Sequence, residues 1–282
     1  MRASVIQMSP GSDKTENISK ARALLEACIA KDRPDLVVLP EMWACLGGDL
    51  QSKYSAAEDI PATGSDEPGG AAFEFLKQAA LANGIFVHGG SIGERAGNKL
   101  FNTSLVFSPA GQVLARYRKI HLFDITTPSG AGYKESDTYL PGTDVVSVPI
   151  GGRFGTFRVG LAICYDIRFG ELFHKLRSEG ADVIVLPAAF TSETGEAHWE
   201  TLLRARAIET QCWFAAAATT GQHLDGRGNP RTTFGHSMIV DPWGTVTATA
   251  SDGPGWTSAM IDTERTARIR ANMPIIEHRR LV

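Results

Sequence analysis

The chain has 282 residues, of which 43% are hydrophobic and 21% are charged, and it carries a formal charge of −3. A chain of this size and composition buries enough apolar surface to fold without disulfides or a structural metal. The charge balance argues against nucleic-acid binding, because only two short basic clusters occur, at 116–119 and 278–280. No apolar stretch has the length of a membrane span.

The first predicted element is a strand at 2–8, which begins so early that it leaves no room for a signal peptide. The four cysteines, at 28, 45, 164 and 212, show none of the CxxC spacing that marks zinc or redox sites. We therefore expect reduced thiols in a cytoplasmic protein, with no zinc or redox site among them.

Strands and helices alternate along the first half of the chain. After the strand at 2–8 we predict a helix at 16–30, a strand at 35–40, a helix at 70–83, a strand at 85–90, and a hairpin with arms at 101–108 and 112–118. The helix at 16–30 places Ile18, Ala21, Leu25, Cys28 and Ile29 on one face. The run at 35–40 is continuously apolar, as expected for a strand covered on both faces.

The second half repeats this alternation. We predict strands at 157–164, 182–190, 212–219, 236–241 and 245–250, with helices at 170–179 and 198–211. The segments 61–70 and 126–143, rich in Gly and Pro, are expected to form surface or active-site loops. The pattern indicates an α/β protein, and because no linker separates the halves we expect one domain over 1–282.

Two nearly identical heptapeptides lie about half a chain apart, DLVVLPE at 35–41 and DVIVLPA at 182–188. Two similar α/β halves would explain them, with two sheets packed face to face and helices outside. Valine-rich buried strands also resemble one another by chance. From the heptapeptide alone, the chance likeness is the simpler explanation.

Reactive side chains follow three predicted strands, at the end where α/β sheets bind their ligands. Glu41, Lys119 and Cys164 each have an ordinary explanation alone, as a helix cap, a surface charge and a small buried apolar residue. Together they are the groups that amide cleavage by a cysteine requires. The sequence therefore favours a nucleophilic cysteine with a glutamate base and a lysine.

The chemistry requires that the protonation of these groups be tuned, because only a thiolate attacks a carbonyl. The reference pKa values of Cys and Glu differ by about 4 units, or about 6 kcal/mol. We therefore expect burial to raise the pKa of Glu41 and Lys119 to lower that of Cys164. Lys119 and the backbone N–H of Tyr165 would stabilise the oxyanion.

A histidine base is the alternative mechanism for a cysteine nucleophile. His121 and His198 lie near the motifs, and spacing alone does not exclude a Cys–His pair. Neither an HExxH motif nor a His/Asp cluster occurs, so the sequence offers no support for a metal site.

Three motifs, LPEMW at 39–43, YRKIHLFD at 117–124 and GLAICYDIRFGE at 160–171, resemble those of the carbon–nitrogen hydrolase, or nitrilase, superfamily. The resemblance implies a four-layer αββα sandwich of two pseudo-symmetric halves with two packed mixed sheets, acting without a cofactor. It implies that Glu41 is the general base, Lys119 the oxyanion stabiliser and Cys164 the nucleophile. It also implies that Glu135 positions Lys119 and the substrate amide.

The sequence after the cysteine separates branches of this superfamily. CYDIRF resembles the Nit amidases and lacks the Cys-Trp-Glu of true nitrilases, which implies that Arg168 binds a substrate carboxylate. A structural salt bridge from Arg168 to Asp166 or Glu171 is the alternative. The segments 189–212 and 235–244 are most similar to deaminated glutathione amidases, and Phe190 and Thr194 are predicted to bind substrate.

Two departures from the family pattern bear on specificity. Gly170 stands where the family usually has proline, and Met42-Trp43 replaces a more usual Cys-Phe pair. Because both lie beside catalytic positions, they affect the expected substrate more than the expected chemistry.

The predicted function is hydrolysis of a small carboxylate-bearing amide to an acid plus ammonia through a cysteine thioester, with deaminated glutathione as the first candidate. The alternative enzyme is an ω-amidase acting on α-ketoglutaramate or α-ketosuccinamate. The alternative of another class is a catalytically silent binding or signalling protein on the same fold. Apart from the amide, the expected partner is a second copy in a homodimer or larger homo-oligomer, with no nucleic acid and no membrane.

Overall fold

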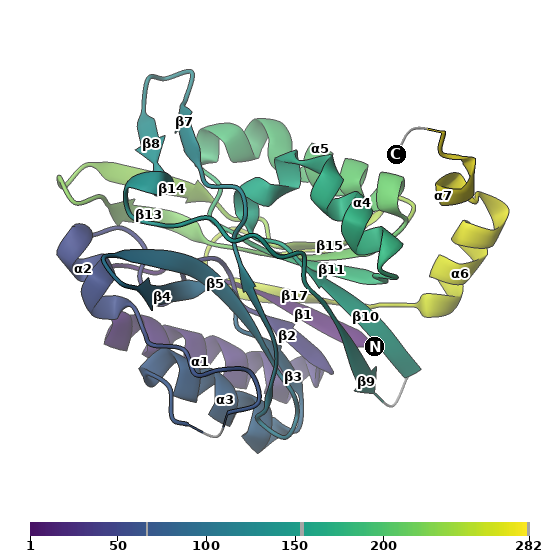
Figure 1. Cartoon of the computed structure of the whole chain (residues 1–282), viewed down its shortest axis with the longest axis horizontal. Helices are drawn as coiled ribbons and strands as arrows, with labels where there is room; N and C mark the ends of the chain where they lie inside the picture. The colour runs from purple at the N-terminus through teal and green to yellow at the C-terminus, as the bar shows by residue number, and fades with distance from the viewer. Residues whose placement is uncertain (66, 153–154, 281–282) are drawn as a thin grey trace.

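Two mixed β-sheets pack face to face at the centre of the molecule (Figure 1). The structure is a computed structural model that describes residues 1–65, 67–152 and 155–280. The first sheet contains, in spatial order, β17 (Gly255–Met260), β1 (Arg2–Gln7), β2 (Leu36–Val38), β3 (Phe86–His88), β5 (Lys99–Phe107) and β4 (Ile92–Ala96), and β6 (Val113–Arg118) pairs with β5. The second contains β16 (Val246–Thr249), β15 (Met238–Val240), β12 (Trp213–Ala218), β11 (Val183–Ala188), β10 (Gly155–Leu161) and β9 (Ser147–Gly152).

Helices cover the outer face of each sheet. The helices α1 (Lys14–Asp32) and α3 (Ala71–Asn83) pack on the first sheet, and α4 (Gly170–Ser178) and α5 (Ser192–Thr210) pack on the second (Figure 1). The predicted αββα sandwich is therefore confirmed. In the described part of the chain, no helix is both long and apolar enough to cross a bilayer.

The remaining elements lie at the two ends of this sandwich. They are the helices α2 (Leu50–Ala56), α6 (Thr263–Asn272) and α7 (Ile275–His278), the hairpins β7 (Asp124–Thr126) with β8 (Gly132–Lys134) and β13 (Thr220–Leu224) with β14 (Pro230–Phe234), and the 3₁₀ turns η1 (Glu135–Asp137) and η2 (Cys164–Arg168). Figure 1 shows α2 and both hairpins at one end, and α6 and α7 at the other.

The two halves share one topology. In the first, β1, β2 and β3 are parallel and are joined through α1 and α3; in the second, β10, β11 and β12 are parallel and are joined through α4 and α5. An antiparallel strand flanks each set on both sides. The two similar heptapeptides form β2 and β11, the middle strand of each set. They therefore occupy equivalent positions in two similar halves.

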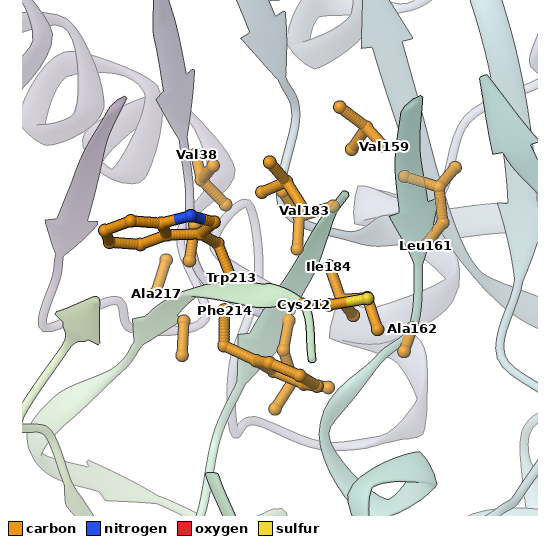
Figure 2. Close-up of a cluster of buried hydrophobic side chains, with 14 of the residues drawn as sticks. Val38, Val159, Leu161, Ala162, Val183, Ile184, Cys212, Trp213, Phe214 and Ala217 are labelled. Carbon is orange, nitrogen blue, oxygen red and sulfur yellow. The ribbon is translucent and has the colours of Figure 1, made fainter. Parts of the chain in front are cut away.

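Both faces of these middle strands are buried. Leu36 and Val38 of β2 point into the core between the sheets, whereas Val37 and Leu39 pack under α1 and α3. Figure 2 shows Val38 in the same apolar cluster as Val183 and Trp213 of the second sheet. This double burial explains why the strand sequence is continuously apolar and not alternating.

The predicted elements are found, with boundaries that local capping explains. In α1, Ala21, Leu25 and Cys28 of the predicted face are buried. The helix predicted at 198–211 begins earlier, at Ser192, because the Thr191 side chain caps it by accepting from the Thr194 N–H. The loop predicted at 126–143 contains β8 and η1, which are too short and polar to give a periodic signal.

Gly90 fixes the backbone next to the end of β2. Its φ is +58°, and a Cβ at this position would lie 2.1 Å from the carbonyl oxygen of Pro40, the residue before Glu41. Ser104 Oγ donates to the Gly90 carbonyl, and the Ser91 N–H donates to the Pro40 carbonyl. Glycine at this position therefore allows a close contact with the Pro40 carbonyl, and this contact positions the backbone of Glu41.

We predict that Gly90→Ala destabilises the fold and displaces Glu41, so that activity falls with stability. Gly97→Ala is the matched control, because Gly97 has a φ of +63° but no atom within 4 Å of the added Cβ. The control should lose about 1–2 kcal/mol from backbone strain alone. Gly90→Ala should lose about 1–3 kcal/mol more from overpacking. Denaturant unfolding measures both, and equal losses would contradict the role given to the Pro40 contact.

Candidate active site

The ammonium of Lys119 lies between two carboxylates. Its Nζ is 2.9 Å from Oε1 of Glu41 and 2.8 Å from Oε2 of Glu135. Only 2% of the Lys119 side chain is exposed, against 5% for Glu41 and 13% for Glu135. The structure thus brings together three of the predicted residues, from the ends of β2 and β6 and from the η1 turn.

Asn102 completes this cluster and was not predicted. Its Nδ2 donates to Glu41 Oε1 at 2.9 Å and to Glu135 Oε1 at 3.2 Å, and its carbonyl accepts from the Lys119 N–H at 2.9 Å. Asn102 is 1% exposed, and its Oδ1 has no hydrogen-bond partner among the described residues. An asparagine inside a predicted strand was the available signal, because strands disfavour this residue.

The two heptapeptides meet at the site. Oε2 of Glu41, which ends the first heptapeptide, accepts from the N–H of Ala189, which follows the second, at 2.8 Å. The Glu41 carboxylate therefore accepts from Asn102, Lys119 and Ala189 together. Three donors with no acceptor opposite them suit an ionised carboxylate.

Cys164 begins η2, directly after β10, in a left-handed conformation with φ of +47°. Non-glycine residues rarely adopt this conformation, and such strain is typical of functional positions. The thiol lies within hydrogen-bonding reach of Glu41. Because Tyr165 is in the first turn of η2, its N–H has no partner within the turn and remains available for an oxyanion.

The protonation of the thiol differs from the sequence prediction. Burial raises the pKa of Cys164 well above its usual range, Glu41 raises it further, and Lys119 offsets only part of this rise. Burial alone would lower the pKa of Lys119, but Glu135 and Glu41 outweigh burial and hold it well above its usual range. The prediction that Lys119 would lower the thiol pKa below its ordinary value is therefore wrong for the free enzyme.

Asp166 joins the cysteine loop to the lysine strand. Its buried carboxylate accepts from the Tyr117 hydroxyl at 2.7 Å, from the Ile163 N–H at 2.8 Å and from the His121 N–H at 3.0 Å. His121 Nδ1 lies 2.7 Å from the same carboxylate, and the ring stacks on Phe169 at 3.8 Å. His121 is thus bound to Asp166 and does not occupy the position of a base for Cys164.

Glu41, Lys119, Glu135 and Cys164 line one cavity of about 330 Å³. Tyr165, Phe190 and Thr194 also line it. Nowhere in the described ranges do three or more His, Cys, Asp or Glu side chains lie close enough together to hold a metal ion.

Arg168 is placed differently. It does not line the cavity, and among described residues it forms no ion pair with Asp166 or Glu171. Its guanidinium lies 5.8 Å from the Tyr165 ring and 5.5 Å from the Phe190 ring, and both nitrogens Nη1 and Nη2 are 3.4 Å from His198 Nδ1. Arg168 therefore supports two rings of the cavity wall.

The two departures from the family pattern have different surroundings. Met42 lines the cavity, with φ of +48°. Trp43 is buried behind it, where its Nε1 donates to the Gly89 carbonyl at 2.8 Å. Gly170 starts α4 outside the cavity, 3.4 Å from Arg206 when a Cβ is added. Of these residues, Met42 is the one placed to affect substrate choice.

Comparisons with known proteins match nearly the whole chain to one family. The family model described as carbon-nitrogen hydrolase matches residues 2–271. A deaminated glutathione amidase of Synechocystis is 40% identical over 98% of this chain and 97% of its own length. An ω-amidase of Xenopus tropicalis is 40% identical over 99% of this chain and 95% of its own. The crystal structure of the C. elegans NitFhit protein superposes with a TM-score of 0.85 at 36% identity, over 99% of this chain and 65% of that longer one.

We predict that Asn102→Ala lowers kcat by roughly tenfold to a hundredfold, with little change in KM. This loss of rate corresponds to the free energy of one hydrogen bond to a charged group. Asn98→Ala, in the exposed turn before β5, is the control and should leave both kinetic constants unchanged. A kcat near that of the wild type in Asn102→Ala, together with a lowered melting temperature, would show that Asn102 only supports the strand.

Proposed function

Because this chain belongs to the carbon–nitrogen hydrolase family, we propose that it hydrolyses the amide of a small carboxylate-bearing molecule through a thioester on Cys164. Deaminated glutathione is the first candidate substrate. The observation that carries the proposal is the buried Lys119, held between Glu41 and Glu135 in the cavity that contains the thiol. This arrangement supplies a base, a cation and a nucleophile within one enclosed space.

Acylation begins from a neutral thiol and a carboxylate. Glu41 takes the thiol proton as Sγ attacks the amide carbon, so the site never holds a free thiolate beside two carboxylates. Charge then develops on the carbonyl oxygen, where the Lys119 ammonium and the Tyr165 N–H stabilise it. Glu41 returns the proton to the leaving nitrogen, and the C–N bond breaks to give the thioester.

Deacylation uses the same groups. Glu41 removes a proton from water, the water oxygen attacks the thioester carbonyl, and Lys119 with the Tyr165 N–H again stabilises the oxyanion. Collapse breaks the C–S bond and releases the acid, and the proton returns to the thiol. Glu135 keeps Lys119 charged throughout, through its contact at 2.8 Å.

An ω-amidase is the second candidate function, favoured by the 40% identical relative of that name. It would use the same catalytic residues on a shorter, primary amide. A catalytically silent protein is not favoured, because Glu41, Lys119, Glu135 and Cys164 are all present and all line one cavity. Because Arg168 does not line the cavity, we propose that it holds the Tyr165 and Phe190 rings in place and does not itself bind the substrate carboxylate.

The proposal extends to the setting of the enzyme. We propose that 1–282 is one catalytic domain, that it works in the cytoplasm with its four buried cysteines reduced, and that it forms a homodimer or larger homo-oligomer. Two exposed apolar side chains on neighbouring elements, Ile208 and Trp243, support self-association. A light-scattering mass of one chain would contradict the oligomer.

The substrate class is tested by a panel of deaminated glutathione, α-ketoglutaramate, a simple aliphatic amide and a nitrile. We expect hydrolysis of the carboxylate-bearing amides and none of the nitrile, measured as acid formed, because a primary amide releases ammonia and a secondary amide an amine. Cys164→Ala should abolish turnover, whereas Cys45→Ala, at another cavity-lining cysteine, should retain it. Mass spectrometry should find the acyl group on Cys164. An active Cys164→Ala enzyme would end the thioester mechanism.

The base is tested by Glu41→Gln, which keeps the size of the side chain and removes its basicity. We expect kcat to fall by roughly 10²–10⁴. The control is His198→Ala, which removes a histidine that does not line the cavity and should leave kcat within a few-fold of wild type. Normal turnover in Glu41→Gln together with loss in His198→Ala would favour the Cys–His mechanism.

A further inference from the structure

We propose that the mouth of the catalytic cavity holds a second carboxylate of the substrate, at a subsite formed by Lys53 of α2 and Arg231 of β14. This inference rests on the proposed function and narrows it to amides with an acidic group on the amine side of the scissile bond. Both residues line the same cavity as Cys164. They are partly exposed, whereas Cys164 and Lys119 are buried, so they mark its opening.

The cations at the mouth are only partly paired with protein carboxylates. Lys53 Nζ has no hydrogen bond or ion pair with any residue in 1–65, 67–152 or 155–280. Arg231 contacts a carboxylate through Nε alone, 3.4 Å from Asp225 Oδ2, and its Nη atoms donate to no described residue. Two cations therefore face one carboxylate, and the Lys53 ammonium and the Arg231 Nη atoms are open to a second anion.

Arg231 is held in place before any ligand arrives. Its guanidinium lies 4.9 Å from the centre of the Tyr133 ring of β8, which also lines the cavity. Its side chain is only 26% exposed. A planar guanidinium fixed against an aromatic face loses little freedom when it binds a carboxylate in a bidentate manner.

His223 lies near both cations. It lies on β13 beside them and lines the cavity. Burial lowers the pKa of His223, and both Arg231 and Lys53 lower it further, against the opposing effect of Asp225. His223 therefore stays neutral near pH 7 and leaves the positive charge of the mouth on Lys53 and Arg231.

The amine side of the substrate is the side that faces the mouth. After thioester formation the acyl part stays on Cys164, while the amine must leave through the opening. Figure 1 shows that α2 and the two hairpins, β7–β8 and β13–β14, lie at one end of the molecule. The helix and both hairpins contribute residues to the lining of the cavity. A carboxylate carried by the leaving amine would therefore pass next to Lys53 and Arg231.

The test uses binding in the Cys164→Ala background, so that no turnover is needed. The probes are deaminated glutathione and the same molecule with its glycine carboxylate blocked as the methyl ester, titrated by calorimetry. The free acid should bind roughly tenfold to a hundredfold more tightly than the ester, as for one charged hydrogen-bonded contact. Adding Arg231→Gln or Lys53→Gln should remove most of this difference and leave ester binding and the melting temperature unchanged.

Arg227→Gln is the matched control, since Arg227 lies in the same hairpin, is exposed and does not line the cavity. It should keep the full preference for the acid. Equal affinity for acid and ester, or no binding of either, would overturn the subsite. A clear preference for the acid, combined with no hydrolysis of deaminated glutathione by the wild type, would instead overturn the proposed function and leave the subsite standing.

Discussion

The site depends on one buried cation shared by two buried carboxylates. Lys119 compensates Glu41 and Glu135, so the cluster carries a net charge of −1 while the thiol is neutral. Ionising Cys164 would make the net charge of the cluster −2 in a space that water scarcely reaches. Burial and this added negative charge explain the raised pKa of the thiol. Removing Lys119 would leave both carboxylates buried and unpaired, at a cost of about 3–5 kcal/mol. The two ion pairs therefore fix the relative positions of Glu41, Lys119 and Glu135.

This electrostatic arrangement sets the order of events in catalysis. A proton transfer from an ordinary thiol to an ordinary carboxyl is uphill by about 6 kcal/mol, and the raised pKa of Cys164 makes it more unfavourable. A turnover of about 10 s⁻¹ allows a total barrier of about 16 kcal/mol, so the proton transfer and the attack on the amide must occur together. The strained φ of Cys164 and the open N–H of Tyr165 are already in place, and neither has to be formed during the reaction. The fold contributes to this preorganisation through the hydrogen bond from the Ala189 N–H to the Glu41 carboxylate, which connects the ends of β2 and β11.

The sequence predicted two kinds of feature: elements with a periodic apolar pattern, and reactive residues near the ends of strands. The buried strands β2 and β11, the helices α1 and α3, and the Glu41–Lys119–Cys164 group follow from apolar runs and from reactive residues at their ends. Asn102, Lys53 and Arg231 were not predicted, because each depends on distant contacts that no local pattern encodes. The predicted thiol pKa was wrong for a related reason: spacing shows that a cation is near, but not that burial and Glu41 outweigh it.

The most direct measurement is the protonation of Cys164 in the free enzyme. The ultraviolet absorbance of thiolate, recorded as wild type minus Cys164→Ala across a pH titration, isolates this one thiol. We predict no thiolate signal at neutral pH, and titration only above about 8.5, the ordinary value for a free cysteine. A thiolate that titrates below pH 7 would contradict the account, because Lys119 would then stabilise a standing ion pair with Cys164 in place of the shared cation between Glu41 and Glu135.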